Sequence, residues 1–186
     1  GAKLLDALDY DPDIYHLNEA HALSCVFHLY NKYNDIEAIK KKMVFTTHTP
    51  EEAGNEKHDI NLLDSLSFFD GIPLEKVREI TGIYDNTFNH TLVGLRLSHY
   101  ANGVSKLHGE VSRDMWKEYT GICPIIHITN AQNKKYWADA WLEEAFQNKD
   151  REAFIKRKTR LKSKLFDVVA DQTGKLFDSN IFTIVW

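Results

Sequence analysis

The sequence lacks the long apolar segments of membrane and secreted proteins and the net positive charge of nucleic-acid-binding proteins. No run of about 18 apolar residues occurs, so no membrane-spanning helix is predicted. The N-terminus has no basic stretch followed by an apolar one, which argues against a secretion signal. The formal net charge of -4 supplies no basic surface for nucleic acid. We therefore expect a cytoplasmic protein that binds neither membrane nor nucleic acid.

The sequence has only two cysteines, Cys25 and Cys123, and both have apolar neighbours. This pattern is typical of buried thiols rather than of a disulfide framework. The nine histidines raise the alternative of a metal site, but His16 and His21 are five positions apart, whereas a zinc helix places its histidines at i and i+4. No Gly-x-Ser-x-Gly elbow is present. We therefore predict that the chain holds no metal ion, and nucleophilic catalysis is disfavoured.

Short apolar runs rich in β-branched residues alternate with helical patterns. The runs, each predicted to form a buried strand, are Ile14–Leu17, Met43–Thr47, Ile125–Thr129 and Ile181–Trp186. The helical segments are predicted over residues 20–33, 35–42, 62–69, 74–80, 91–116, 134–148 and 150–171. This alternation predicts an α/β fold, helix-rich with a few parallel strands.

Two of the predicted helices have apolar stripes that we expect to face the core. The stripe in the segment 91–116 consists of Leu97, Ala101, Val104, Leu107, His108, Val111 and Met115. His108 is therefore predicted to be a core histidine rather than a ligand. The stripe in the segment 150–171 consists of Phe154, Leu161, Leu165 and Val168. The sequence ends on an apolar run without a turn residue, so we expect it to be a fragment of a longer protein.

Polar residues follow three of the predicted strands directly. They are Asn18, Glu19 and His21 after the first, His48 and Thr49 after the second, and Asn130 after the third. Ligands of open parallel sheets bind at the carboxyl ends of the strands, where these loops meet. Carboxamide, imidazole and carboxylate groups suit a hydroxyl-rich ligand such as a sugar. The alternative for each is a structural role, as a helix cap for Asn18 or Glu19 and as a loop residue for His48.

Four ordered motifs resemble those of a known enzyme family. They are His16–His21, Phe45–Pro50 with Ala53 and Gly54 behind it, Asn102–Ser112, and His127–Asn130 with the segment through Trp137. In order and spacing they resemble the α-glucan phosphorylases of the shorter bacterial and archaeal type, relatives of glycogen and maltodextrin phosphorylase. Leu176–Asp178 resembles a later segment of the same family. The resemblance therefore extends over nearly the whole chain.

The resemblance implies a glycosyltransferase of carbohydrate metabolism with two Rossmann-like domains, the GT-B architecture. Such an enzyme transfers a glucosyl unit from an α-1,4-glucan to inorganic phosphate, giving glucose 1-phosphate, with pyridoxal phosphate as its acid–base group. Residues 1–178 would be part of the N-terminal Rossmann-like domain, and residues 179–186 a strand toward the missing cofactor-binding domain. The parent enzyme is expected to be a homo-oligomer. The fragment alone is expected to be inactive and to bind no cofactor.

The resemblance also implies roles for particular residues. His48 and Asn130 would hold the 6-hydroxyl of the glucosyl unit, Glu19 and His21 would line the cleft, and Val104 would pack near the sugar. No catalytic residue of the parent is expected within this chain, because the cofactor lysine belongs to the second domain.

The sequence departs from the family pattern at two places. The run Asn130 to Asn133 reads Asn-Ala-Gln-Asn where the family usually has Asn-Gly-Val-His, and Ala20 stands where glycine is common. If position 131 requires a positive φ angle, alanine there costs about 1 kcal/mol. The alternative function is therefore a non-catalytic glucan-binding relative of the family. A metal-dependent hydrolase that uses the histidines is the third hypothesis.

Overall fold

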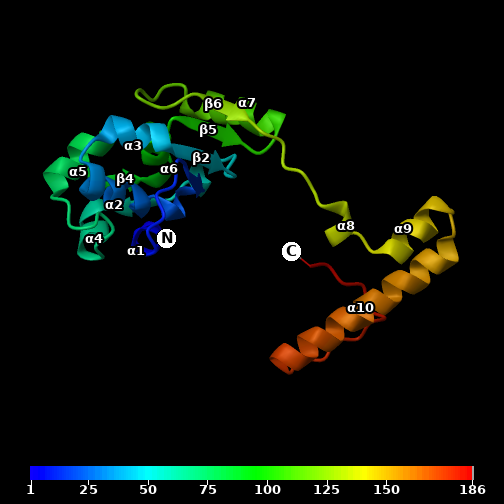
Figure 1. Cartoon of the computed structure of the whole chain (residues 1–186). Coiled ribbons are helices and arrows are strands. Elements are labelled where there is room, and N and C mark those ends of the chain that lie inside the picture. The colour runs from blue at the N-terminus through cyan, green and yellow to red at the C-terminus, as the bar shows by residue number, and fades with distance from the viewer. Residues whose placement is uncertain (186) are drawn as a thin grey trace. The chain divides into compact units, whose positions relative to one another are not determined.

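The computed structural model describes residues 1–185, which form two compact units, 1–130 and 131–185. The helices and strands of the first unit are, in chain order, α1 (Ala2–Ala7), β1 (Tyr15–Asn18), η1 (Ala20–Ala22), α2 (Ser24–Tyr33), α3 (Ile36–Lys42), β2 (Met43–Thr47), η2 (Glu52–Gly54), β3 (Lys57–Asp59), α4 (Ile60–Ser65), α5 (Leu74–Thr81), β4 (Thr87–Asn89), α6 (His90–Arg96), β5 (Tyr100–Gly103), α7 (Lys106–Trp116) and β6 (Ile125–His127). Figure 1 shows these elements in the blue to green part of the ribbon.

The main sheet of this unit is parallel throughout, in the order β1-β2-β5-β6. Its register places Asn18 opposite Thr46, Thr46 opposite Asn102, and Asn102 opposite Ile126. The remaining two strands, β3 and β4, pair antiparallel. The predicted helix-rich α/β fold with a parallel sheet is confirmed, and so are the strands predicted at the positions of β1, β2 and β6.

Side-chain caps explain where several helices begin. Asp35 accepts hydrogen bonds from the N–H groups of Glu37 and Ala38 at the start of α3, both at 3.0 Å. Asn89 caps α6 in the same way, and Ser105 caps α7. Because the first N–H groups of a helix have no partner within it, such caps fix the point where the loop becomes helix.

The prediction of a single long helix over 91–116 is wrong, because α6, β5 and α7 occupy this segment. Tyr100–Gly103 forms a central strand because both of its edges find partners, β2 on one side and β6 on the other. Gly103 also allows a close approach of the helix that follows, because a Cβ there would lie 2.9 Å from the backbone nitrogen of Gly109. Leu107, predicted on the buried stripe, is 69% exposed.

The core lies on one face of the main sheet. Its largest fully buried side chains are Trp116, Phe27, Phe45, Phe69 and Phe88. The alternating burial of β1, with Tyr15 and Leu17 inside, leaves His16 and Asn18 on the opposite, exposed face.

The two cysteines of this unit are free thiols. Cys123 is buried, as predicted, whereas Cys25 is only half-buried. Burial raises the pKa of Cys123 to about 11, so this thiol stays protonated and unreactive at neutral pH.

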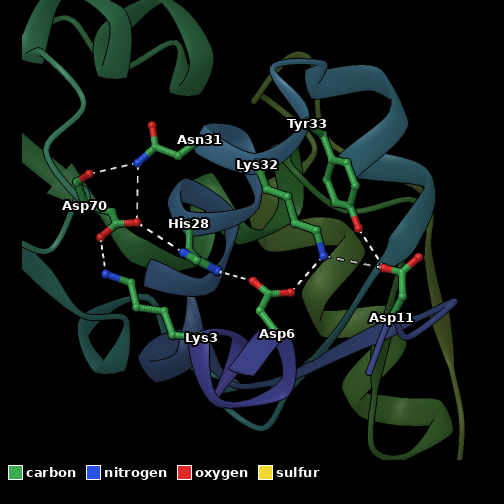
Figure 2. Close-up of polar contacts among 8 residues, drawn as sticks. All are labelled: Lys3, Asp6, Asp11, His28, Asn31, Lys32, Tyr33 and Asp70. Carbon is green, nitrogen blue, oxygen red and sulfur yellow. Dashed lines mark hydrogen bonds and ion pairs between the residues drawn. The ribbon is translucent and has the colours of Figure 1, made fainter. Parts of the chain in front are cut away.

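An ion-pair network joins the N-terminal helix to the rest of the unit (Figure 2). The ring of His28, on α2, lies between Asp6 of α1 and Asp70, with its nitrogens 2.6 and 3.2 Å from the two carboxylates. Lys32 donates to Asp6 at 2.7 Å, and Lys3 pairs with Asp70. These contacts lower the pKa of both carboxyls, mainly through Lys32 for Asp6 and Lys3 for Asp70.

The second unit is helical and consists of α8 (Lys134–Trp137), α9 (Ala140–Gln147) and α10 (Arg151–Thr173). Asp150 caps α10, and Gly174 ends it in a left-handed conformation. Asp139 caps α9 and also accepts two hydrogen bonds from Arg157 at 2.9 and 2.5 Å, which lower the pKa of Asp139 to about 2. These contacts join α9 to α10.

Two predictions for this unit are wrong. Residues 181–185 form no strand, because no neighbouring strand pairs with them in the described part of the chain, and Trp186 lies outside it. The apolar stripe of α10 does not face a core, since no residue of this helix is buried and Leu165 is 47% exposed. Within residues 1–185, no helix has the length and apolar character needed to cross a membrane.

Candidate functional site

The loops after the strands of the main sheet form the candidate site. All four strands are parallel, so their carboxyl ends lie at one edge. Glu19 follows β1, His48 follows β2, Val104 follows β5, and Asn130 comes three residues after β6. The sequence predicted three of these loops correctly. The loop after β5 was not predicted to follow a strand, because the sequence of β5 was assigned to a helix.

Glu19 contacts the loop after β2. Its Oε1 atom accepts a hydrogen bond from the backbone N–H of His48. The hydroxyls of Thr47 and Thr49 donate to the same oxygen at 3.4 and 3.3 Å. The backbone N–H of Glu19 donates to the carbonyl oxygen of Thr46 at 2.9 Å, which continues the pairing of the two strands by one residue. One carboxylate oxygen therefore holds three successive residues of the neighbouring loop.

The backbone of Glu19 adopts a conformation that side chains disfavour. Its φ is 62° and its ψ is 176°. This region is occupied almost exclusively by glycine, and a residue with a side chain there costs about 1–3 kcal/mol. The strained residue of the site is therefore Glu19. Ala131 is not among the residues with a positive φ angle, so the free-energy cost of alanine in that conformation does not arise at position 131.

The ring of His48 is held by the residue before Glu19. Its Nε2 atom lies 2.7 Å from the Oδ1 atom of Asn18. Because a carboxamide oxygen only accepts, Nε2 carries the proton in this arrangement. In the neutral ring, Nδ1 is then an acceptor for a donor such as a hydroxyl group. Asn18 and Glu19 thus contact the side chain and the backbone of the same histidine.

A row of hydrogen bonds crosses three strands close to these loops. His16 Nε2 lies 2.7 Å from the Oγ1 atom of Thr46, and the Thr46 hydroxyl donates to Oδ1 of Asn102 at 2.8 Å. The Thr46 hydroxyl has one proton, so His16 must be the donor in the first contact. This row ties the ends of β1, β2 and β5 together on the exposed face of the sheet.

Val104 and Asn130 are joined directly, because the Asn130 N–H donates to the Val104 carbonyl at 3.0 Å. The Val104 N–H in turn donates to Nδ1 of His108 at 3.2 Å. His108 is 7% exposed, which confirms the prediction of a core histidine. Its Nε2 atom has no hydrogen-bond partner among residues 1–185.

The structure does not bring His21 into these contacts. His21 lies in η1, its side chain is largely exposed, and its Nδ1 atom is 3.5 Å from a carboxylate oxygen of Glu56. Farther along the chain, Asn133 caps α8 through a bond to the Tyr136 N–H at 3.3 Å, so the residue that stands in place of a family histidine has a structural role.

The site has hydrogen-bonding groups but no concentration of positive charge. Carboxylate, imidazole, amide and hydroxyl groups make its contacts, and in the described residues no lysine or arginine takes part in them. No three histidine, cysteine, aspartate or glutamate side chains within residues 1–185 are grouped so as to hold a metal ion. The chemistry of the site matches a neutral, hydroxyl-rich ligand.

The sequence is similar to parts of several known proteins. An uncharacterized protein of Methanocaldococcus jannaschii is 44% identical over 93% of this chain and 33% of its own length. The maltodextrin phosphorylase of Thermococcus litoralis is 35% identical over 74% of the chain and 18% of its own length. The glycogen phosphorylase of Aquifex aeolicus is 32% identical over 82% of the chain and 24% of its own length. No family model matches the chain.

These similarities relate the chain in sequence to part of the glycogen and maltodextrin phosphorylases. The chain spans a third or less of the length of the curated relatives it matches.

Proposed function

We propose that this chain is the sugar-binding part of an α-glucan phosphorylase. The parent enzyme would be a GT-B glycosyltransferase that moves a terminal glucosyl unit from an α-1,4-glucan to inorganic phosphate. The observation that carries the proposal is that the loops with Glu19, His48 and Asn130 lie at one edge of the sheet. The segment that contains these loops is similar in sequence to phosphorylases. By the same resemblance, we propose a cytoplasmic homo-oligomer.

The described groups suit a glucosyl unit. His48 offers Nδ1 as an acceptor for a sugar hydroxyl, since its Nε2–H is directed to Asn18. Asn130 is exposed and offers both a carboxamide oxygen and an amide N–H₂ group. We assign the 6-hydroxyl to these two residues, and the apolar contact with the ring to Val104. Glu19 and His21 are proposed to line the same cleft.

Pyridoxal phosphate does not fit the contacts at these strand ends. Its aldehyde requires a lysine amine, whereas carboxylate, imidazole, amide and hydroxyl groups make these contacts, and no lysine or arginine of residues 1–185 takes part in them. We therefore propose that the parent enzyme binds the cofactor through its second domain. The residues described here are proposed to bind and orient the glucan, and no step of the reaction is derived through the cofactor.

The test is phosphorolysis by the full-length parent protein. With maltodextrin, inorganic phosphate and added pyridoxal phosphate, we expect release of glucose 1-phosphate. His48→Ala should reduce kcat/KM by about tenfold or more, because a buried polar contact to substrate contributes about 1–3 kcal/mol. His99→Ala, a change at an exposed histidine, is the control. An inactive parent with bound cofactor would contradict the proposal.

A non-catalytic glucan-binding protein is the second candidate function. The observation that favours it is the run Asn130 to Asn133, which lacks the family histidine and places a helix cap at Asn133. This candidate predicts maltodextrin binding without glucose 1-phosphate release, in a parent that lacks the cofactor lysine. The complete reading frame of the parent and the phosphorolysis assay together decide between the two.

A further inference from the structure

We infer that Glu19 is a positioning residue, which uses a strained backbone to fix the loop that presents His48. This role deepens the proposed function and rests on it for the identity of the ligand. It adds a structural role to the proposed place of Glu19 in the cleft, because the hydrogen bonds of its carboxylate are made with the protein itself. The inference starts from two independent observations, the backbone conformation of Glu19 and the convergence of three donors on one of its oxygens.

The backbone conformation is the first observation. Glu19 has φ 62° and ψ 176°, a region that glycine occupies almost alone. Glycine at this position would relieve the strain without changing the path of the chain. The strain is therefore retained together with a side chain, which indicates that the side chain has a use that glycine does not serve.

The donors around the carboxylate are the second observation. The backbone N–H of His48 and the hydroxyls of Thr47 and Thr49 all donate to Oε1. Thr47 also accepts the N–H of Thr49 at 3.3 Å, so the loop is closed on itself as well as on Glu19. Hydrogen bonds to an ionised acceptor are roughly twice as strong as neutral ones. The carboxylate therefore fixes the path of the backbone directly after β2.

Asn18 and Glu19 divide the task of holding His48. Asn18 accepts from the imidazole Nε2–H, and Glu19 accepts from the backbone N–H of the same residue. Successive side chains of an extended strand point to opposite faces, so two consecutive residues do not normally reach one neighbour. The unusual backbone of Glu19 ends the extended conformation at this point and lets both side chains act on the loop after β2.

The experiment measures the exchange rate of the His48 amide proton by NMR in the 186-residue chain, without ligand. Glu19→Gln keeps the shape of the side chain but removes its charge, and we expect the exchange to be about tenfold faster. Glu19→Gly, which adopts the observed backbone without strain, should accelerate it at least as much. Glu51→Gln, a change at an exposed glutamate of the same loop region, is the matched control and should leave the rate unchanged.

Two results would overturn the inference. In the first, the His48 amide exchanges in both Glu19 variants at the rate found for Glu51→Gln. In the second, adding maltodextrin to the unaltered chain accelerates exchange of the His48 amide, because the carboxylate would then leave the loop to bind ligand. Absence of maltodextrin binding together with faster exchange in the variants would contradict the proposed function and would leave the positioning role supported.

Discussion

His48 and Asn18 lie on neighbouring strand ends, 30 positions apart in the sequence, with the imidazole Nε2 atom 2.7 Å from the carboxamide oxygen. This contact places the proton on Nε2 and leaves Nδ1 of the neutral ring as an acceptor.

Asn18→Ala removes the acceptor and frees the His48 ring to rotate and change tautomer. Because one hydrogen bond contributes about 0.5–1.5 kcal/mol, we expect the affinity of the parent protein for maltodextrin to fall about threefold to tenfold. Isothermal titration calorimetry measures this change. Asn18→Asp retains an oxygen at the same position and serves as the control. Unchanged affinity in Asn18→Ala would show that the contact has no part in binding.

Gly103→Ala tests the close approach of β5 and α7. The added Cβ would lie 2.9 Å from the Gly109 nitrogen and 3.0 Å from the His108 carbonyl carbon, and backbone atoms at these distances must move apart. Overpacking of this kind costs about 1–3 kcal/mol of unfolding free energy, measurable by urea denaturation. Gly54→Ala, where the new methyl meets only the side-chain methyl of Thr49, should cost less. Equal losses would contradict the predicted contact.

His28→Leu tests the network that holds α1. The change leaves the carboxylates of Asp6 and Asp70 without their shared partner while Lys32 and Lys3 remain. Since these groups are partly exposed, we expect a loss of about 1–2 kcal/mol, together with faster amide exchange in α1. His99→Leu, at an exposed histidine, is the control. A variant in which α1 stays as protected as before would show that His28 has no part in holding this helix.

Because His90 is buried, we expect the free energy of unfolding to depend on pH. Burial among Phe68 and Phe88, together with neighbouring His58, lowers the pKa of His90 from 6.5 to about 4. The unfolded chain therefore binds more protons between pH 4 and 6.5, and stability falls as the pH is lowered through this range, by at most about 3 kcal/mol. The fall should be complete near pH 4.

The measurement is the urea midpoint of the chain at several pH values between 4 and 7. His90→Leu removes the titrating group and should flatten this part of the profile, whereas Tyr84→Phe, at an exposed position, should leave it unchanged. A wild-type profile that is already flat between pH 4 and 6.5 would contradict the low pKa of His90.

Local patterns in the sequence were sufficient to predict part of the fold. The strands at Met43–Thr47 and Ile125–His127 follow from compact β-branched runs. The helices predicted over 35–42 and 150–171 correspond to α3 and α10, because their patterns repeat within a few residues. Such features depend on neighbours in the chain, so the sequence alone indicates them.

The errors share a physical cause. Tyr100–Gly103 has the apolar spacing of a helix, and only pairing with β2 and β6 makes it a strand. Ile181 to Val185 has the composition of a strand and finds no partner strand among residues 1–185. The presence of a partner strand decides the conformation of the first segment and its absence that of the second, and local propensity does not contain that information.

The sequence by itself determined that polar residues follow the strands at Glu19, His48 and Asn130, and that a parallel sheet would bring such residues to one edge. Only the tertiary structure decided how they meet. The strained backbone of Glu19 and the convergence of three donors on its carboxylate depend on the register of β1 against β2. That register is set by the buried face of the sheet, because a slip of one residue would turn Leu17 and Phe45 away from the core.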